Sequence, residues 1–400
     1  MYRTSFPYYY DIVGSFLRTE TLKAAKRQYK QGEMSAVKLK RIENQAVREL
    51  VRKQKEAGLK AVTDGELHRR WWHLDFLWYL NGIERRKYKI RPEIFREEKT
   101  EPETLVICNK ISFGNHPFLN HFRFLKSIAG KATAKMTIPS PAMLHLICCV
   151  HPETYRPIPA YRDEKNLFED IITAYRKALK AFYDAGCRYL QFDDISWGEF
   201  CSKERREVYQ KRGIKTEDLV ERYVWLVNQV LKGKPADMAV AIHICRGNFN
   251  SARIISGSYE FVAEKLFGEC EADGFFLEYD SERSGDFKPL RYIRDQKVVL
   301  GLISTRSPQM ERDKDIKKKI LEASEYVPLS QLCLSPQCGF ASEEDQCFLT
   351  EEQQWEKIRI MKRIAEDVWN EGGRPASSPG LSFFQGFDSF EHQMRFDEAK

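Results

Sequence analysis

The chain of 400 residues can bury one large hydrophobic core, and a (β/α)8 barrel with insertions reaches this length. Its net charge of +7 is spread along the sequence. The densest basic runs, at 84–87 and 317–319, are short and lack interleaved aromatic residues, which argues against a nucleic-acid partner. No apolar run reaches the roughly 18 residues of a membrane span, and residues 1–16 lack the features of a secretory signal, so we expect a cytoplasmic protein.

Short apolar runs alternate with long amphipathic stretches, a pattern typical of βα units around a parallel sheet. Strands are predicted at 11–16, 60–66, 131–140, 189–193, 238–245, 274–279, 298–304 and 331–336. The main helices are predicted at 20–57 with a break near Gly32, and at 167–185, 217–232 and 351–370.

Eight strands that alternate with helices indicate an α/β fold, namely a single (β/α)8 TIM-barrel domain over residues 1–400. We expect an insertion at 85–130 after the second strand, in which the alternating residues 104–112 predict a β-hairpin. The segment 372–400 is rich in Gly, Pro, Ser and Phe, and we expect it to form an irregular tail.

Polar residues that can catalyse or bind metal gather where the predicted strands end, whereas the strand bodies are apolar. In barrels of this kind the catalytic groups lie at the C-terminal ends of the strands. The segments in question are 13–16, 64–66, 138–141, 193–194, 243–248, 278–280, 304–305 and 335–339. This distribution predicts a site at the C-terminal mouth of the barrel.

Two of the ten cysteines lie in polar, glycine-adjacent contexts at such strand ends, namely Cys245 and Cys338. His243 and Cys245 are two residues apart, so on a strand both side chains point to the same face. Glu278 ends another strand, and the four side chains could converge on one zinc ion. A His-x-Cys pair on a strand is also a common packing arrangement, and that alternative stays open.

A centre with two thiolates and a carboxylate carries much negative charge, which weakens zinc as a generator of hydroxide. Such a centre is better suited to deprotonating a substrate thiol for alkyl transfer. A zinc hydrolase, the rival interpretation, would more plausibly show several histidines near the strand ends. We do not expect a histidine cluster among the remaining residues of that type, which are His68, His73, His116, His121, His145, His151 and His392.

Other polar residues at the mouth could hold an amino-acid substrate. Glu66 and Asp193 are candidate catalytic and substrate-binding carboxylates that could take its ammonium group. The Val13 and Gly14 backbone with the Ser15 hydroxyl could receive its carboxylate, because glycine permits close approach. An N-cap or an ion pair is the alternative for these acidic residues and for the neighbouring Asp194.

The same segments resemble the cobalamin-independent methionine synthase family, in its short form that corresponds to the C-terminal catalytic barrel. The resemblance spans roughly 12–370 and is carried by several motifs in the family's order. They are Val13-Gly14-Ser15-Phe16, Val62-Thr63-Asp64-Gly65-Glu66, Gln191-Phe192-Asp193-Asp194, His243-Ile244-Cys245, Leu277-Glu278-Tyr279 and Leu334-Ser335-Pro336-Gln337-Cys338-Gly339-Phe340. It implies zinc bound by His243, Cys245, Glu278 and Cys338, and homocysteine held by Val13 to Ser15, Glu66 and Asp193.

The departures from the family concern the methyl donor. Ser304 stands where the family has a histidine after the seventh strand, and Asp194-Ile195 replaces the second carboxylate and proline of an Asp-Glu-Pro motif. The family's tryptophan after the third strand is absent from 139–141, and the chain has no room for the full-length enzyme's extra N-terminal barrel.

The sequence thus predicts a zinc-dependent methyltransferase that acts on a small-molecule thiol. Homocysteine is the expected thiol and methionine the product, with methyltetrahydrofolate or another compound as methyl donor. Another thiol of the coenzyme M kind, a corrinoid donor, a zinc hydrolase and a non-catalytic thiol- or zinc-binding protein stay open as alternatives. No nucleic-acid or membrane partner is expected, and the oligomeric state is open.

Overall fold

The computed structural model describes residues 6–87, 103–152, 155–247, 255–341 and 348–369. Its strands are β1 (Ala61–Val62), β2 (Asn81–Lys87), β3 (Glu103–Ser112), β4 (Thr133–Pro139), β5 (Tyr189–Asp194), β6 (Ala239–Ile244), β7 (Gly274–Glu278), β8 (Lys297–Ile303) and β9 (Leu332–Pro336). Its α-helices are α1 (Glu20–Lys30), α2 (Ala36–Glu56), α3 (Leu74–Leu77), α4 (Pro117–Ala129), α5 (Pro141–His145), α6 (Glu164–Asp184), α7 (Ser196–Cys201), α8 (Lys203–Lys211), α9 (Thr216–Leu231), α10 (Glu260–Glu269), α11 (Asp313–Ser324) and α12 (Glu351–Trp369). The regular structure also includes a π-helix at Leu146–Val150 and short 3-10 helices at Pro159–Tyr161, Glu282–Ser284, Lys288–Tyr292 and Leu329–Gln331.

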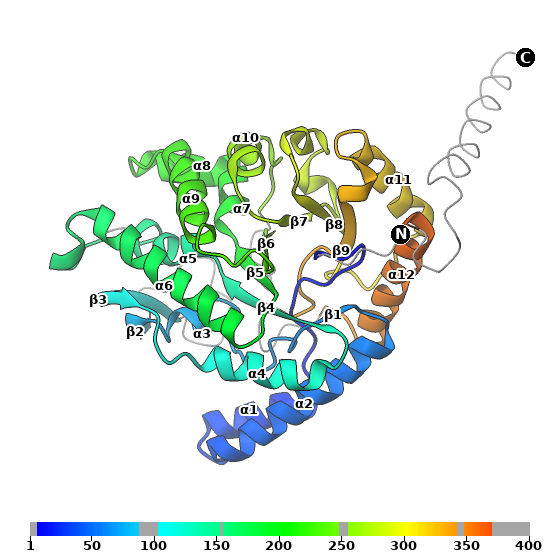
Figure 1. Cartoon of the computed structure of the whole chain (residues 1–400), viewed down its shortest axis with the longest axis horizontal. Coiled ribbons are helices and arrows are strands. Elements are labelled where there is room, and N and C mark those ends of the chain that lie inside the picture. Colours follow the sequence, from blue (N-terminus) through cyan, green and yellow to red (C-terminus); the bar gives the residue numbers. More distant parts are fainter. Residues whose placement is uncertain (1–5, 88–102, 153–154, 248–254, 342–347, 370–400) are drawn as a thin grey trace, which may run out of the picture.

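A parallel sheet of seven strands, in the order β1-β4-β5-β6-β7-β8-β9, forms the centre of the described residues. The sheet is curled, and the helices form a ring around it (Figure 1). Strands alternate with helices because long amphipathic stretches such as 164–184 present one apolar face to the sheet. The predicted α/β barrel fold is confirmed.

The segment that follows Phe6 occupies the place between β9 and β1, where an eighth strand would close the barrel. Tyr10 forms a parallel bridge with Leu334, and the amide of Phe16 donates to the carbonyl of Gly65 at 3.1 Å. The predicted strand at 11–16 is nevertheless wrong as a ladder strand. Its carbonyls accept hydrogen bonds from side chains instead. Gln191 Nε2 donates to Val13 O, and Thr63 Oγ1 donates to Gly14 O.

The predicted strand at 60–66 is shortened to Ala61–Val62 by a side chain. Gln54 on α2 donates to the carbonyl of Thr63 at 2.8 Å and accepts from its amide at 3.0 Å. The amide and the carbonyl of Thr63, which would extend the ladder, therefore bond Gln54 instead of a neighbouring strand. The chain turns after Thr63 and brings Glu66 into the left-handed region with φ 59°.

The expected hairpin is present as β2 paired antiparallel with β3 (Figure 1). It begins at Asn81, before the predicted insertion, and α4 occupies much of the rest of the 85–130 segment as a barrel helix beside β4. The helix was not expected, although Pro117 is its first residue and proline at that position is a known helix-start signal. The predicted tail at 372–400 lies outside the described residues.

The inside of the barrel is closed below the mouth by a cluster of buried side chains that includes Val13, Tyr189, Ala241, Phe276 and Cys333. In a parallel sheet, residues that are paired in register, and residues two apart on one strand, point to the same face. Asp193 is paired with His243, and Glu278 lies two residues beyond the inward-facing Phe276. The layer above the apolar cluster is therefore polar. Among the described residues, every helix is too short or too polar to span a membrane.

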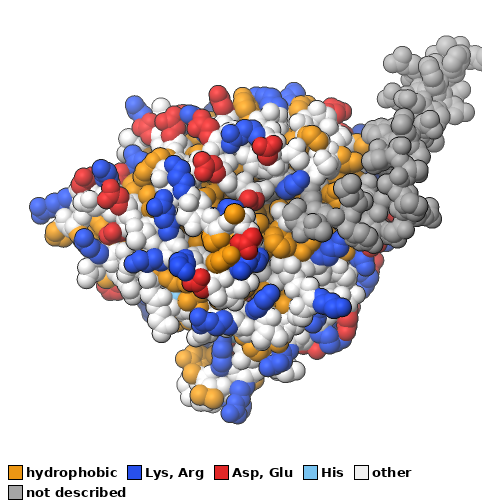
Figure 2. Space-filling model, viewed as in Figure 1, with side chains coloured by type: hydrophobic (Ala, Val, Ile, Leu, Met, Phe, Trp, Pro, Cys, Tyr) orange, Lys and Arg blue, Asp and Glu red, His pale blue; other side chains and the backbone are white. Residues whose placement is uncertain are grey.

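On the face seen in Figure 2, basic and acidic side chains are interspersed, as the spread charge predicts.

Candidate metal centre and substrate site

Four side chains from three strand ends converge at the mouth of the barrel. His243 lies on β6, Cys245 follows β6, Glu278 ends β7 and Cys338 follows β9. Each offers a ligand atom, all four residues are buried, and these atoms lie within 4.8 Å of one another. The predicted convergence of these residues is therefore present in the fold.

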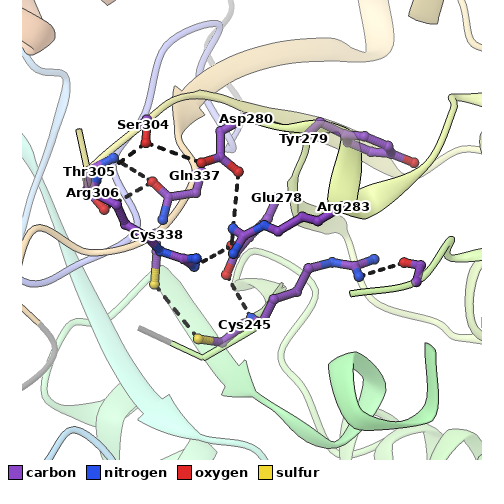
Figure 3. A network of polar contacts seen from close by, with 12 residues as sticks. Cys245, Glu278, Tyr279, Asp280, Arg283, Ser304, Thr305, Arg306, Gln337 and Cys338 are labelled. Carbon is purple, nitrogen blue, oxygen red and sulfur yellow. Dashed lines mark hydrogen bonds and ion pairs between the residues drawn. The ribbon is translucent and has the colours of Figure 1, made fainter. Parts of the chain in front are cut away.

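The two thiols of this set face each other, with their sulfur atoms 3.8 Å apart (Figure 3). A tetrahedral ion with zinc–sulfur bonds of about 2.3 Å would separate two sulfur ligands by roughly 3.8 Å. Without a cation, the contact with Cys245 and burial together raise the pKa of Cys338 well above its ordinary value. The thiol pair therefore has the spacing of two metal ligands, and a positive charge beside Cys338 would favour its ionised form.

The imidazole of His243 is buried, and among the described residues neither ring nitrogen has a hydrogen-bond partner. Such unpaired buried nitrogens are costly, and the cost is removed when a nitrogen binds a metal. Burial lowers the pKa of His243 to about 3, with nearby Lys135 as a second cause. The ring is therefore neutral and keeps a lone pair, as a metal ligand must.

The carboxylate of Glu278 is held from two sides. One oxygen accepts from the amide of Arg246 at 2.7 Å, and the other accepts from Arg283 and, at 3.1 Å, from Arg306 (Figure 3). Arg283 also contacts Asp280 at 3.1 Å. Burial raises the pKa of Glu278 overall, while the two guanidinium groups act in the opposite direction. These arginines therefore fix the orientation of the carboxylate and offset its charge.

The sequence did not predict the two arginines around Glu278. Arg283 lies in a 3-10 turn and Arg306 in the loop after β8, so neither belongs to the strand or helix periodicity that identified the ligands. Ser304 donates its hydroxyl to Asp280 at 3.2 Å. The mouth beside Glu278 is thus built from polar and charged loop residues.

Glu66 and Asp193 form a second polar group at the mouth. Asp193 is adjacent to His243 in the ladder, and its charge interacts with that of Glu66. Burial and then Glu66 raise the pKa of Asp193 well above its ordinary range, and burial likewise raises the pKa of Glu66. Two buried carboxyls with raised pKa values form a site that favours a cation.

Neighbouring side chains orient these two carboxyls. Thr137 donates its hydroxyl to Glu66 Oε1 at 2.8 Å, Arg69 Nη1 lies 3.4 Å from the same oxygen, and Gln191 donates to Asp193 at 2.6 Å. Arg69 is buried and bonds Thr137 as well. It is thus a structural partner of Glu66.

The segment Val13 to Ser15 passes beside both groups. A Cβ on Gly14 would lie 3.0 Å from Glu66 Oε1 and 2.9 Å from a methyl of Thr137, so only glycine lets the backbone approach this closely. Ser15 lies against Gly339, where a Cβ would come within 1.9 Å of its hydroxyl oxygen. The segment therefore links the carboxyl pair to the loop that carries Cys338.

Similarity to known proteins shows to which family the chain belongs. A family model described as "Cobalamin-independent synthase, Catalytic domain" matches residues 147–366. The chain is 46% identical over 371 residues to "Uncharacterized protein YxjH" of Bacillus subtilis (strain 168), which covers 91% of this chain and 95% of that protein. The chain belongs to the cobalamin-independent synthase family.

Solved structures agree with this assignment to the cobalamin-independent synthases. The putative vitamin-B12 independent methionine synthase from Listeria monocytogenes has a TM-score of 0.73 and 44% identity, and the match covers 91% of this chain and 99% of that one. A B12-independent methionine synthase from Shewanella sp. W3-18-1 matches in fold, with a TM-score of 0.65, 20% identity and coverage of 85% and 91%. Membership of this family indicates a methyltransferase.

Asp194 has a structural role in this member of the cobalamin-independent synthases. It follows Asp193 on β5, so its side chain points away from the barrel interior. It accepts from the amide of Ser196 at 2.8 Å and from the hydroxyls of Ser140 and Ser196. This arrangement corresponds to the capping alternative of the sequence analysis.

Burial raises the pKa of Asp194 to about 6, which yields a test of this role. A carboxyl with a raised pKa binds its proton more tightly in the folded state, so this group's contribution to the free energy of unfolding falls as pH rises from about 4 to about 6. The loss amounts to about 3 kcal/mol. We expect Asp194→Asn to remove this part of the slope in denaturant titrations across that pH range. An unchanged slope would contradict the role.

Two of the remaining histidines lie together, a contact that the sequence did not predict, although they do not form the strand-end cluster expected of a zinc hydrolase. The rings of His68 and His121 stack with centroids 4.2 Å apart, and both lie beside Asp64. These residues come from the turn after β1 and from α4. Residue spacing could not show the contact because it depends on where α4 packs. His392 lies outside the described residues.

Proposed function

We propose that this protein transfers a methyl group to the sulfur of homocysteine, giving methionine, with zinc bound by His243, Cys245, Glu278 and Cys338. The observation that carries the proposal is the buried convergence of these four side chains at the barrel mouth, with the two sulfur atoms 3.8 Å apart. The unpartnered nitrogens of His243 support the fit of a metal ion to these residues. Bound there, zinc would lower the pKa of the substrate thiol so that a thiolate is present at neutral pH.

The amino-acid end of the substrate would lie against the carboxyl pair. Glu66 and Asp193 would bind the ammonium group, which supplies the positive charge that two buried carboxyls favour. The Val13 and Gly14 backbone and the Ser15 hydroxyl would bind the carboxylate. The Shewanella protein was solved in complex with selenomethionine, a selenium analogue of the proposed product, which is consistent with an amino-acid ligand for this fold.

In the net reaction the thiol loses its proton, a sulfur–carbon bond forms, and the bond between the methyl group and its donor breaks. Glu66, Asp193 and the Val13–Ser15 segment would orient the amino acid so that its sulfur reaches the thiol pair. Fixed orientation of this kind lowers the barrier because the reacting atoms are already in place.

The proposal is tested by incubating the zinc-loaded protein with homocysteine and a panel of donors that includes methyltetrahydrofolate and a methyl-corrinoid. We expect methionine, detected by mass spectrometry, with at least one donor, and its loss after chelation of zinc. Absence of methionine with every donor would contradict the proposal, as would turnover of an ester or amide without any thiol.

A further inference from the structure

A second group of metal-capable side chains lies outside the mouth. Asp64 follows β1, His68 lies four residues later in the same turn, and His121 lies on α4. Their ligand atoms come within 4.8 Å of one another. The group contains no sulfur and shares no residue with the centre at the mouth.

The contact between Asp64 and His68 is too long for an ordinary charged hydrogen bond. One oxygen of Asp64 accepts from the amide of Glu66 at 2.9 Å, and the other lies 3.4 Å from His68 Nδ1. A hydrogen bond between an imidazolium and a carboxylate spans about 2.7–2.9 Å. A tetrahedral ion with bonds of about 2.1 Å to nitrogen and oxygen would separate two such ligands by roughly 3.4 Å.

The third side chain offers a nitrogen without a partner. His121 stacks on His68 at an interplanar angle of 13°, and among the described residues its buried Nδ1 has no hydrogen-bond partner. A buried imidazole nitrogen without a hydrogen-bond partner is costly, and binding a metal ion removes that cost.

We propose that Asp64, His68 and His121 form a second divalent-metal site, selective for first-row ions that accept nitrogen and oxygen ligands, such as Zn²⁺ or Co²⁺. Two imidazoles and one carboxylate supply three protein ligands, and water would complete the coordination. The side chains of His68 and Asp64 are only 1% and 4% exposed, so an ion bound there would be largely shielded from solvent.

The charges around this site set how tightly it can bind. Lys40 interacts with both Asp64 and Glu43, and Arg69 also lies within range of Asp64. Lys40 and Arg69 are therefore cations that compete with a metal for Asp64. An ion at this site would also act on the mouth, because Asp64 holds the amide of Glu66, whose φ of 59° places it in the left-handed region.

The test is the zinc content of the tag-free, full-length chain after saturation with Zn²⁺ and gel filtration. We expect two ions per chain in the wild type and one in His121→Phe, which keeps a ring stacked on His68 but removes the unpartnered nitrogen. His151→Phe is the matched control and should keep two, because His151 belongs to neither group and pairs with Glu199. Lys40→Met should slow the loss of the second ion to a chelator.

Cobalt distinguishes this site from the centre at the mouth independently of activity. Co²⁺ at a thiolate site gives sulfur-to-metal charge-transfer absorption, whereas a site of nitrogen and oxygen ligands does not. His68→Gln, a second variant in case His121→Phe misfolds, should lose the cobalt of the second site and keep the charge-transfer bands. Cys338→Ser should keep the cobalt of the second site and lose those bands. One ion in the wild type that both histidine variants keep, or two ions in both histidine variants, would overturn the second site and leave the proposed function untouched.

Discussion

Replacement of Cys338 by serine is expected to lower both zinc content and methyl transfer, with activity falling by more than about 10²-fold. Loss of a side chain that only supports a ligand costs 10- to 100-fold in such sites, and loss of a ligand itself should cost more. Cys245 would lose the sulfur neighbour that lies 3.8 Å from its own sulfur, and the ion would lose one of its proposed ligands. Zinc per chain and the rate of methionine formation are the two measurements.

Cys333→Ser is the matched control for this prediction. Cys333 is a buried thiol on β9, five residues before Cys338, and it packs in the cluster below the mouth. Its replacement should lower the melting temperature without changing zinc per chain. If Cys338→Ser binds as much zinc per chain as the wild type, or if Cys338→Ser and Cys333→Ser lose equal amounts, the thiol pair is not the metal centre.

The second large effect is expected from Glu66→Gln, which should raise the KM for homocysteine by about 10²- to 10³-fold. A charged group removed from a buried pair typically costs about 3–4 kcal/mol, and that energy corresponds to this change. A thiol without an ammonium group should be unaffected, because Glu66 is proposed to act on that group alone. Steady-state kinetics with homocysteine and a simple alkyl thiol make the comparison.

The pH dependence of binding gives an independent readout for Glu66. Because the folded-state pKa values of Glu66 and Asp193 are raised, the fraction of each that is ionised grows as pH rises through those values. Homocysteine should therefore bind more tightly as pH rises, and Glu66→Gln should flatten this rise. Glu199→Gln replaces a buried carboxyl outside the site, paired with His151 and Tyr209, and should leave the profile unchanged. An unaltered KM in Glu66→Gln would exclude its proposed role.

Periodicity alone placed most strands and the main helices, because apolar strand bodies and amphipathic helices follow directly from burial. It failed where side chains replaced backbone partners. Gln54 ends β1 early by taking both backbone groups of Thr63, and Gln191 takes a carbonyl of the 11–16 segment. Such substitutions depend on contacts between distant residues and leave no local pattern in the sequence.

The residues at the mouth were predictable for a related reason. His243 and Cys245 follow the two-residue period of a strand, and barrel topology brings the ends of β6, β7 and β9 together. Arg283, Arg306 and the stacked His68 and His121 were not predicted, because loop conformation and helix packing decide where they lie. The sequence could therefore identify the candidate ligands but not the charged groups around them.

X-ray absorption at the zinc edge of the His121→Phe variant, loaded with one zinc ion, tests the central claim most directly. Two sulfur neighbours and two nitrogen or oxygen neighbours are expected, as Cys245, Cys338, His243 and Glu278 would provide. A spectrum fitted by nitrogen and oxygen alone, or one with a single sulfur, would show that the two cysteines do not share an ion.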